Sequence, residues 1–357
     1  MKTYIRFLTI SFLKSFINIF LIMLSLVLIL NLLSEIDFFK DIEVGSFFPA
    51  YLALLNSGSL IFEMFPFICL VCTQFFFIGF FKDDQLNIFK YSGLKNTSII
   101  KILSLLTFLI GVFVIIFFYN FTSNLKNFYL ELKSNYTSDD KYLAVITNNG
   151  LWIKDKIENR ILIINSTKIK PDHLIDTFIS EFDSDFNIIR NIKSDKVNIK
   201  NNEWIIYDAE IFANNTSTAK KNIKIKSNFN YERIQGLFSN LSSLSVLELI
   251  KLKENYKLLG YSTVEVEVHL NRLISYPFYL LLMTIFSSII MFNSKNLKNT
   301  GIKITIGLFF SVIIYYINNF FYLLGNTERI SIYVSIWAPL FFLTAMNFLM
   351  MRKINEK

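Results

Sequence analysis

Long apolar runs separated by short polar segments occupy most of the chain. Six runs hold enough consecutive apolar residues to cross about 30 Å of hydrocarbon as helices. They are Phe16–Leu33, Ser57–Phe81, Ile102–Phe121, Leu273–Phe292, Ile304–Gly325 and Ile330–Met351. The first could be a signal peptide, because Lys2, Arg6 and Lys14 precede it, but it is long and no small-residue cleavage site follows. The pattern therefore predicts six spans, three on each side of a long interruption.

The interruption between the third and fourth spans has a different pattern, made of short runs of β type. Asn-Gly at 149–150 and Asn-Asn at 201–202 are typical of turns. Seven or eight short strands without helices favour a sandwich or a jelly roll, whose open edges could accept a strand from another protein. The clearest runs are Tyr142–Thr147, Leu151–Ile153, Ile161–Ile164, Ile188–Ile192, Val197–Ile199, Trp204–Tyr207 and Ile223–Ile225.

A helix is expected after the strands. Ser245 and Glu248 form a capping box and Gly260 suits the position after a helix end, which predicts a helix over Val246–Leu259. Ser262 and Glu265 form a second box that leads into the fourth span. We interpret this helix as a connector rather than as a binding element.

The predicted fold class is a membrane α-helical bundle of six helices, arranged 3+3, with an all-β jelly-roll-like domain inserted between helices three and four. Residues 1–121 hold the first three spans, and residues 263–357 hold the last three. Residues 122–262 form the inserted domain with its connecting helix.

Composition and charge agree with a membrane protein and set its orientation. The 357 residues are 53% hydrophobic and only 18% charged, which excludes an ordinary soluble domain. The net charge of +8 is spread along the chain and flanks apolar runs, so it does not indicate nucleic-acid binding. Basic residues dominate the N-terminus, the loops after spans two and four, and the tail. The loop after span one is acidic, with Glu35, Asp37, Asp41 and Glu43. Both termini are therefore predicted to be cytoplasmic, and the inserted domain lies on the other side.

No catalytic motif is present in the sequence. There is no P-loop, no G-x-S-x-G and no H-E-x-x-H, and the only histidines are His173 and His269. Cys69 and Cys72 lie in an apolar run without a neighbouring His or third Cys, so packing is favoured over a redox or metal site. Transport driven by a partner protein is a better hypothesis than enzymatic catalysis.

The loop between spans two and three, Lys82–Lys101, predicts a short cytoplasmic helix over about residues 83–93. Asp83 or Asp84 can cap this helix, and Gly93 can end it. Such a helix could dock into a groove of a partner or lie on lipid. Its apolar residues are Leu86, Ile88, Phe89 and Tyr91.

Two ionisable residues are expected at similar depth in the membrane. Glu63 lies within span two, and Arg272 immediately precedes span four, close to His269. An ionisable residue in a span usually faces protein or water and has a partner. Glu63 and Arg272 could pair with each other, or Arg272 could meet a lipid phosphate. Pro66, Pro277 and Pro339 lie inside spans, where they can kink helices.

Taken together and in order, several stretches resemble the LptF/LptG family of lipopolysaccharide export permeases. DDQLNIFKYSGL resembles the family's coupling helix, and NGLWIKD resembles its GLWxKD segment, which favours the LptG branch. EVHLNRLISYPF is similar to the start of span four, where Glu, His, Arg and Pro recur in that order. The stretches are Asp83–Leu94, Asn149–Asp155, Ile161–Ile169 (ILIINSTKI), Glu267–Phe278, Ile314–Phe321 (IYYINNFF) and Ala338–Leu340 (APL).

The resemblance implies a subunit that extracts lipopolysaccharide from the outer leaflet of the bacterial inner membrane. Its expected partners are an LptF-like permease in a heterodimer, a cytoplasmic LptB-like ATPase dimer, and LptC-like and LptA-like periplasmic proteins. ATP and Mg²⁺ would bind to the ATPase, and no cofactor is expected in this chain. Gln85 departs from the family's usual Glu, and no basic residue lies near Ser59. The implied ATPase-coupling residues are Asp84, Gln85, Leu86, Ile88, Phe89, Tyr91 and Gly93.

The resemblance also implies a substrate cavity lined by spans one and five. The i, i+4, i+5 spacing of Tyr315, Asn319 and Phe320 predicts a common helical face towards this cavity, with Arg272 and Glu63 nearby. The same face could instead pack against span one or the partner permease.

Three other functions are compatible with parts of the pattern. Another ABC permease, such as one for lipoprotein release, usually has four spans with the outer domain after span one. A membrane acyl- or glycosyltransferase needs a catalytic His or carboxylate cluster. A scaffold would act through its outer domain alone, and copurification with an ATPase separates the transporters from the last two.

Overall fold

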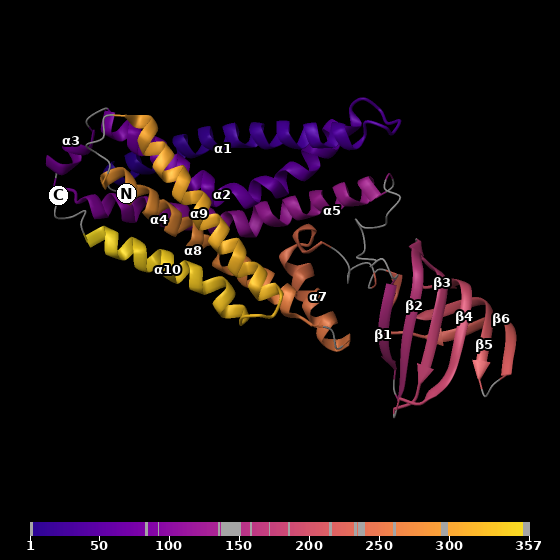
Figure 1. Cartoon of the computed structure of the whole chain (residues 1–357). Coiled ribbons are helices and arrows are strands. Elements are labelled where there is room, and N and C mark those ends of the chain that lie inside the picture. The colour runs from indigo at the N-terminus through magenta and orange to yellow at the C-terminus, as the bar shows by residue number, and fades with distance from the viewer. Residues whose placement is uncertain are drawn as a thin grey trace. The chain divides into compact units, whose positions relative to one another are not determined.

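The computed structural model divides the chain into two compact units. One unit comprises Met1–Tyr129 and Val264–Lys357, and the other comprises Leu130–Thr263. Figure 1 shows long helices in the first unit and a β-sheet in the second. The structure describes residues 3–82, 85–91, 93–134, 136, 151–157, 159–170, 172–184, 186–213, 216–231, 234, 240–259, 262–293 and 299–352.

Six helices of the described residues are long and apolar enough to cross a membrane, which confirms the predicted number of spans. The third is composite, because α4 continues through a π-helical turn, η1, into α5. Most helices extend beyond the predicted apolar runs, since a helix continues into the interfacial regions. Their bounds are α1 (Thr3–Phe38), α2 (Phe48–Lys82), α4 (Asn96–Phe113), η1 (Val114–Tyr119), α5 (Asn120–Ser134), α8 (Val264–Asn293), α9 (Thr300–Asn326) and α10 (Ile332–Arg352).

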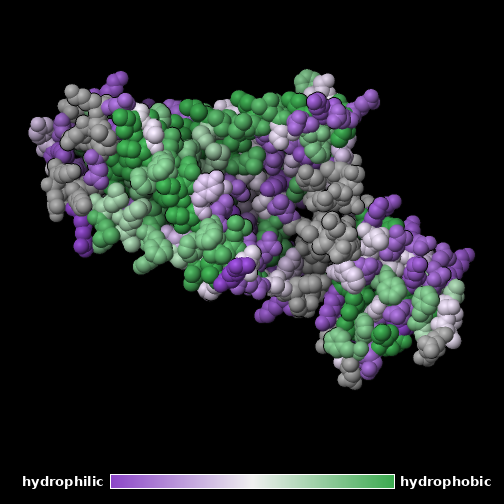
Figure 2. Space-filling model, viewed as in Figure 1, coloured by the Kyte–Doolittle hydropathy of each residue, from purple (hydrophilic) through white to green (hydrophobic). Residues whose placement is uncertain are grey.

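Helices α2 and α8 form the centre of the helical unit. In their most apolar segments 67% and 72% of residues are buried, against 17% in both α1 and α9. Gly111 of α4 allows close packing on α8, because a β-carbon there would lie 2.7 Å from Cα of Pro277. Figure 2 shows apolar side chains over the middle of the helices and hydrophilic side chains towards their ends.

Polar side chains connect the central helices within this apolar packing. Ser287 Oγ of α8 donates to the carbonyl of Leu70 in α2 at 2.8 Å. The Tyr119 hydroxyl of the third span lies 3.0 Å from Nε2 of His269 in α8. Cys69 and Cys72 of α2 are fully buried, and Cys72 Sγ donates to the Cys69 carbonyl at 3.3 Å. Such burial suits a packing role for both thiols.

The second unit contains a six-stranded antiparallel sheet in sequential order, β1 to β6. The inserted strand-rich domain is thereby confirmed. Two predicted runs, 188–192 and 197–199, belong largely to one long strand, β4, and β3 escaped prediction. The candidate strand 142–147 and the turn 149–150 lie outside the described residues. The strands are β1 (Leu151–Ile157), β2 (Arg160–Lys170), β3 (His173–Phe182), β4 (Ile188–Asn198), β5 (Glu203–Ala213) and β6 (Thr216–Lys226).

A row of buried isoleucines runs across one face of this sheet. These residues are direct neighbours across five strands and are between 0% and 7% exposed. β-Branched side chains pack well on a pleated surface, and cross-strand pairs of this kind stabilise a sheet. The row consists of Ile153, Ile164, Ile179, Ile192 and Ile211.

Buried carboxylates fix the sheet and the segment that follows it. Glu181 accepts from Arg160 Nη1 and Arg190 Nε, both at 2.6 Å, which joins β2, β3 and β4. Asp155 of the GLWIKD stretch is fully buried and accepts from Ser227 Oγ and from Asn228 backbone and side-chain nitrogens at 2.7–2.9 Å.

Helix α7 (Val246–Leu259) begins at the predicted capping box. The backbone N–H of Ser245 donates to Glu248 Oε2 at 2.7 Å, and the N–H of Glu248 points back to Ser245 Oγ at 3.4 Å. Gly260, proposed as its terminating residue, lies outside the described residues.

Candidate functional site

A cavity of about 640 Å³ lies between α1, α2, α8 and α9. Its volume falls within the range of small-molecule sites, and most of its lining is apolar. The mixture of aliphatic walls and a few polar groups suits an amphiphile. The lining comprises Val27, Leu30, Asn31, Ser34, Asn56, Leu60, Glu63, Met64, Pro66, Phe67, Tyr279, Met283, Ser311, Val312 and Tyr315.

Two asparagines of the cavity lining connect α1 with α2. Asn31 Nδ2 donates to the Ala53 carbonyl at 2.8 Å, and Asn56 Nδ2 donates to Asn31 Oδ1 at 3.3 Å. These hydrogen bonds hold the two helices side by side at one wall of the cavity. Neither residue was predicted from the sequence, although Asn31 is a polar residue within an apolar run, which is a usable signal.

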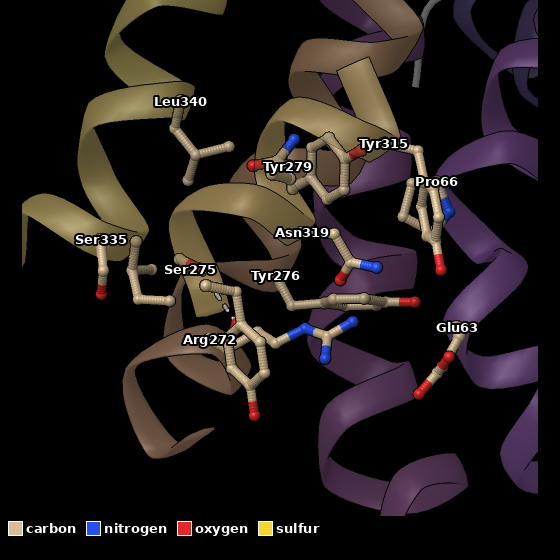
Figure 3. Close-up of a pocket in the computed structure, with 13 residues that line it drawn as sticks. Glu63, Pro66, Arg272, Ser275, Tyr276, Tyr279, Tyr315, Asn319, Ser335 and Leu340 are labelled. Atoms are coloured by element: carbon tan, nitrogen blue, oxygen red, sulfur yellow. Dashed lines mark hydrogen bonds between the residues drawn. The ribbon is translucent and has the colours of Figure 1, made fainter. Parts of the chain in front are cut away.

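A smaller pocket of about 50 Å³ adjoins the cavity and shares Glu63, Pro66, Tyr279 and Tyr315 with it. Its lining is rich in hydroxyl, amide and charged groups from α2, α8, α9 and α10 (Figure 3). The other lining residues are Arg272, Ser275, Tyr276, Asn318, Asn319, Tyr322, Ser335, Ile336 and Leu340.

Arg272 and Glu63, predicted at similar depth, line this same pocket. The Arg272 guanidinium lies 4.9 Å from the centre of the Tyr322 ring, a cation–π contact. Both residues belong to the part of the chain that the structure describes, and no salt bridge joins them. The proposed direct pair is thus not formed, and both side chains point towards the same space (Figure 3). The nearby His269 is buried against Tyr119 instead.

The three residues predicted on span five occupy different surroundings. Tyr315 lines both the cavity and the pocket, and Asn319 lines the pocket. Phe320 lines neither, and it is 59% exposed on the surface of α9. Five residues turn an α-helix about 140° past a full turn, so Phe320 points away from the lining to which Tyr315 contributes, and its place at the substrate cavity stays a prediction.

The predicted coupling helix corresponds to α3 (Gln85–Tyr91), which follows α2. Leu86 is buried and belongs to the core of the helical unit. The Phe89 ring packs on Phe80, with ring centres 5.6 Å apart. Ile88 and Tyr91 are 62% and 91% exposed, so these two, not Leu86, offer apolar surface to a partner. Gly93 follows α3 with a φ of 79°, a conformation that favours glycine, whereas Asp84 lies outside the described residues.

Comparison with known families decides the relationship. The family described as lipopolysaccharide export system permease LptF/LptG matches residues 6–353. The chain belongs to the LptF/LptG family. This match covers both units, so helices and inserted sheet are parts of one family architecture. No curated protein sequence matches the chain significantly.

As a member of the LptF/LptG family, the chain is a multi-pass permease of lipopolysaccharide export. This membership disfavours the lipoprotein-release, transferase and scaffold alternatives. The family match covers LptF and LptG jointly, so assignment to the LptG branch stays a prediction.

Proposed function

We propose that the chain is one permease half of an ABC exporter that takes lipopolysaccharide from the outer leaflet of the inner membrane. The substrate enters the cavity between α1, α2, α8 and α9, and a separate cytoplasmic ATPase dimer drives its release towards a periplasmic bridge. The cavity of about 640 Å³ is the observation that carries this proposal. It offers apolar walls for acyl chains and polar groups for a head group in one continuous space.

The peripheral helices support lateral entry of a lipid and a second permease subunit. Helices α1 and α9 line the cavity and are also the two least buried spans. Their exposed faces carry large apolar side chains, among them Leu26 and Ile29 on α1 and Phe309 and Tyr316 on α9. One of these faces meets lipid and the other meets an LptF- or LptG-like partner, so that the two halves together enclose the substrate.

The ATPase docks at α3 in this proposal. Ile88 and Tyr91 provide the contact surface, while Leu86 and Phe89 anchor the helix on the chain's own core. ATP and Mg²⁺ bind to the ATPase, since the sequence contains no P-loop. The basic loops after spans two and four support a cytoplasmic position for α3 and for both termini.

The sheet forms the first part of the path beyond the membrane. Strands β1 and β6 are the terminal strands of the described sheet, and β6 is exposed along nearly its whole length. Edge strands carry unpaired backbone groups that accept a further strand. An LptC-like or LptA-like protein extends the sheet at such an edge.

Reconstitution tests this proposal. The chain is purified with its subunits and placed in proteoliposomes that contain lipopolysaccharide, with an LptA-like acceptor outside. We expect ATP-dependent transfer of lipopolysaccharide to the acceptor, abolished when the ATPase is catalytically inactive. Transfer that is independent of ATP, or copurification without any ATPase, would contradict it.

A further inference from the structure

The small pocket brings one cationic and one anionic side chain to the same space without joining them. Arg272 comes from α8 and Glu63 from α2, and both point into the pocket (Figure 3). Ionisable side chains within spans normally face a partner or a polar cavity. Here the described residues leave a space of about 50 Å³ around them. By the requirement of about 10–15 Å³ per water, this space holds a few waters or one small polar group.

The position of the pocket along the helices corresponds to lipid head groups. At about 1.5 Å per residue, Glu63 lies roughly 28 Å from Lys82 at the end of α2. Arg272 lies roughly 31 Å from Asn293, where α8 ends. A hydrocarbon core about 30 Å thick therefore places both side chains at its far boundary from α3.

The pocket contains the planar guanidinium of Arg272 and offers hydroxyl and amide groups that could hydrogen-bond a ligand. Tyr322 lies against one face of the Arg272 guanidinium, which leaves its N–H edge for hydrogen bonds. The Arg272 carbonyl is already engaged, since Ser275 Oγ donates to it at 3.0 Å. Tyr315 and Asn319 from α9 add polar groups to the same space.

The signs of the charges select the ligand. A simple anion would be attracted by Arg272 and repelled by the Glu63 carboxylate, and a simple cation would meet the reverse. The Glu63 carboxylate also interacts electrostatically with Lys126 of α5, so cationic and anionic side chains lie near one another around this pocket. A group that carries a phosphate and an ammonium a short distance apart satisfies both charged residues.

We propose that this pocket binds a phosphoethanolamine head group, with its phosphate on Arg272 and its primary ammonium on Glu63. The ammonium also faces the aromatic rings of tyrosines, which attract cations. Because Glu63, Pro66, Tyr279 and Tyr315 also line the large cavity, the acyl chains extend into that cavity. Phosphatidylethanolamine and phosphoethanolamine-modified lipid A both supply this chemistry. The inference rests on the proposed function only for the orientation of the chain in the membrane and for the access of the lipid from the outer leaflet.

Native mass spectrometry of the full chain, purified with its subunits and delipidated, tests the proposal. Three lipids with identical acyl chains serve as probes: phosphatidylethanolamine, phosphatidylcholine and phosphatidylglycerol. We expect phosphatidylethanolamine to be retained about tenfold better than phosphatidylglycerol, which has no ammonium for Glu63. The retention of phosphatidylcholine should lie between those of the other two lipids, since its quaternary ammonium cannot donate a hydrogen bond. Lipid A with and without phosphoethanolamine forms the second arm and separates the two sources.

Substitutions assign the two ends of the head group. Glu63→Gln should lower retention of phosphatidylethanolamine about tenfold and leave phosphatidylglycerol unchanged. Arg272→Gln should lower retention of both, whereas Arg272→Lys keeps most binding and guards against a folding defect. Arg329→Gln and Glu265→Gln, which alter exposed charges outside the pocket, are matched controls and should change neither lipid.

Equal retention of phosphatidylethanolamine and phosphatidylglycerol, with no benefit from modification of lipid A, would overturn the proposal. So would a Glu63→Gln variant that binds all lipids as the unmodified chain does. Selective binding of phosphoethanolamine together with no ATP-driven lipopolysaccharide transfer would contradict the proposed function and leave the pocket assignment intact.

Discussion

The side-chain amide of Gln74 donates from Nε2 to the backbone carbonyl of Lys303 at 2.9 Å. Gln74 is fully buried in α2, and Lys303 lies in the first turns of α9. Gly307 makes the approach possible, because a β-carbon there would lie 2.0 Å from Gln74 Nε2. These two contacts join α2, which leads into α3, to α9, which contributes to the cavity lining. Both contacts lie towards the α3 end of α2.

Gly307→Val should therefore force α9 away from α2. Overpacking of this kind costs about 1–3 kcal/mol, and the Gln74 side chain that it meets is fully buried. We expect a lower melting temperature of the purified complex and less lipopolysaccharide release per ATP hydrolysed. The double variant with Gln74→Ala should recover part of both losses, since the colliding amide is gone. Additive losses in the double variant would show that the two residues are not in contact.

The two faces of α3 should respond differently to an introduced charge. Ile88→Asp and Tyr91→Asp alter exposed residues, so the ATPase should be lost from pull-downs while the melting temperature of the permease stays unchanged. Leu86→Asp buries a charge in the chain's own core and should lower the yield of folded protein. Full ATPase recovery with both surface variants would refute docking through α3.

The Arg160–Glu181–Arg190 cluster should dominate the electrostatic stability of the sheet. Glu181 is 3% exposed, and its loss leaves Arg190, 30% exposed, without its carboxylate. Both arginine side chains remain partly exposed to solvent, which weakens the interaction. We therefore expect Glu181→Ala to lower the free energy of unfolding by about 2 kcal/mol. The matched control is Glu203→Ala, which removes the exposed Lys224–Glu203 pair and should cost at most about 0.5 kcal/mol. Hydrogen exchange of peptides from β2 to β4 measures the difference, and equal protection in both variants would contradict it.

Much of the fold was predictable because the hydrophobicity of a segment is nearly sufficient to identify a membrane span. Apolar runs gave six spans, and the capping box at Ser245 and Glu248 gave the start of α7. Strand β3 escaped because His173, Asp176 and Thr177 interrupt its apolar residues, so cross-strand pairing rather than a local run creates it. Strand β4 looked like two runs because Lys193, Asp195 and Lys196 separate its apolar ends.

The candidate site was less predictable, because its geometry depends on contacts between distant helices. Glu63 and Arg272 stood out as ionisable residues near spans, and both line one pocket. Which side of α3 is buried depends on Phe80 and the core behind it, so sequence spacing could not separate Leu86 from Ile88. Gln74 resembled any polar residue in an apolar run until the Lys303 carbonyl and Gly307 were placed beside it.

Adjacent tyrosines on α9 allow the central claim to be tested with a matched pair. Tyr315 lines the cavity, whereas Tyr316 lines neither it nor the pocket and is 67% exposed. A photo-crosslinking residue is placed at each position in turn, in membranes that contain lipopolysaccharide and phospholipid. We predict that position 315 captures lipopolysaccharide, that the yield falls when the ATPase turns over, and that position 316 captures far less. Capture of phospholipid alone at position 315, or equal lipopolysaccharide capture at both positions without a response to ATP, would contradict the substrate cavity.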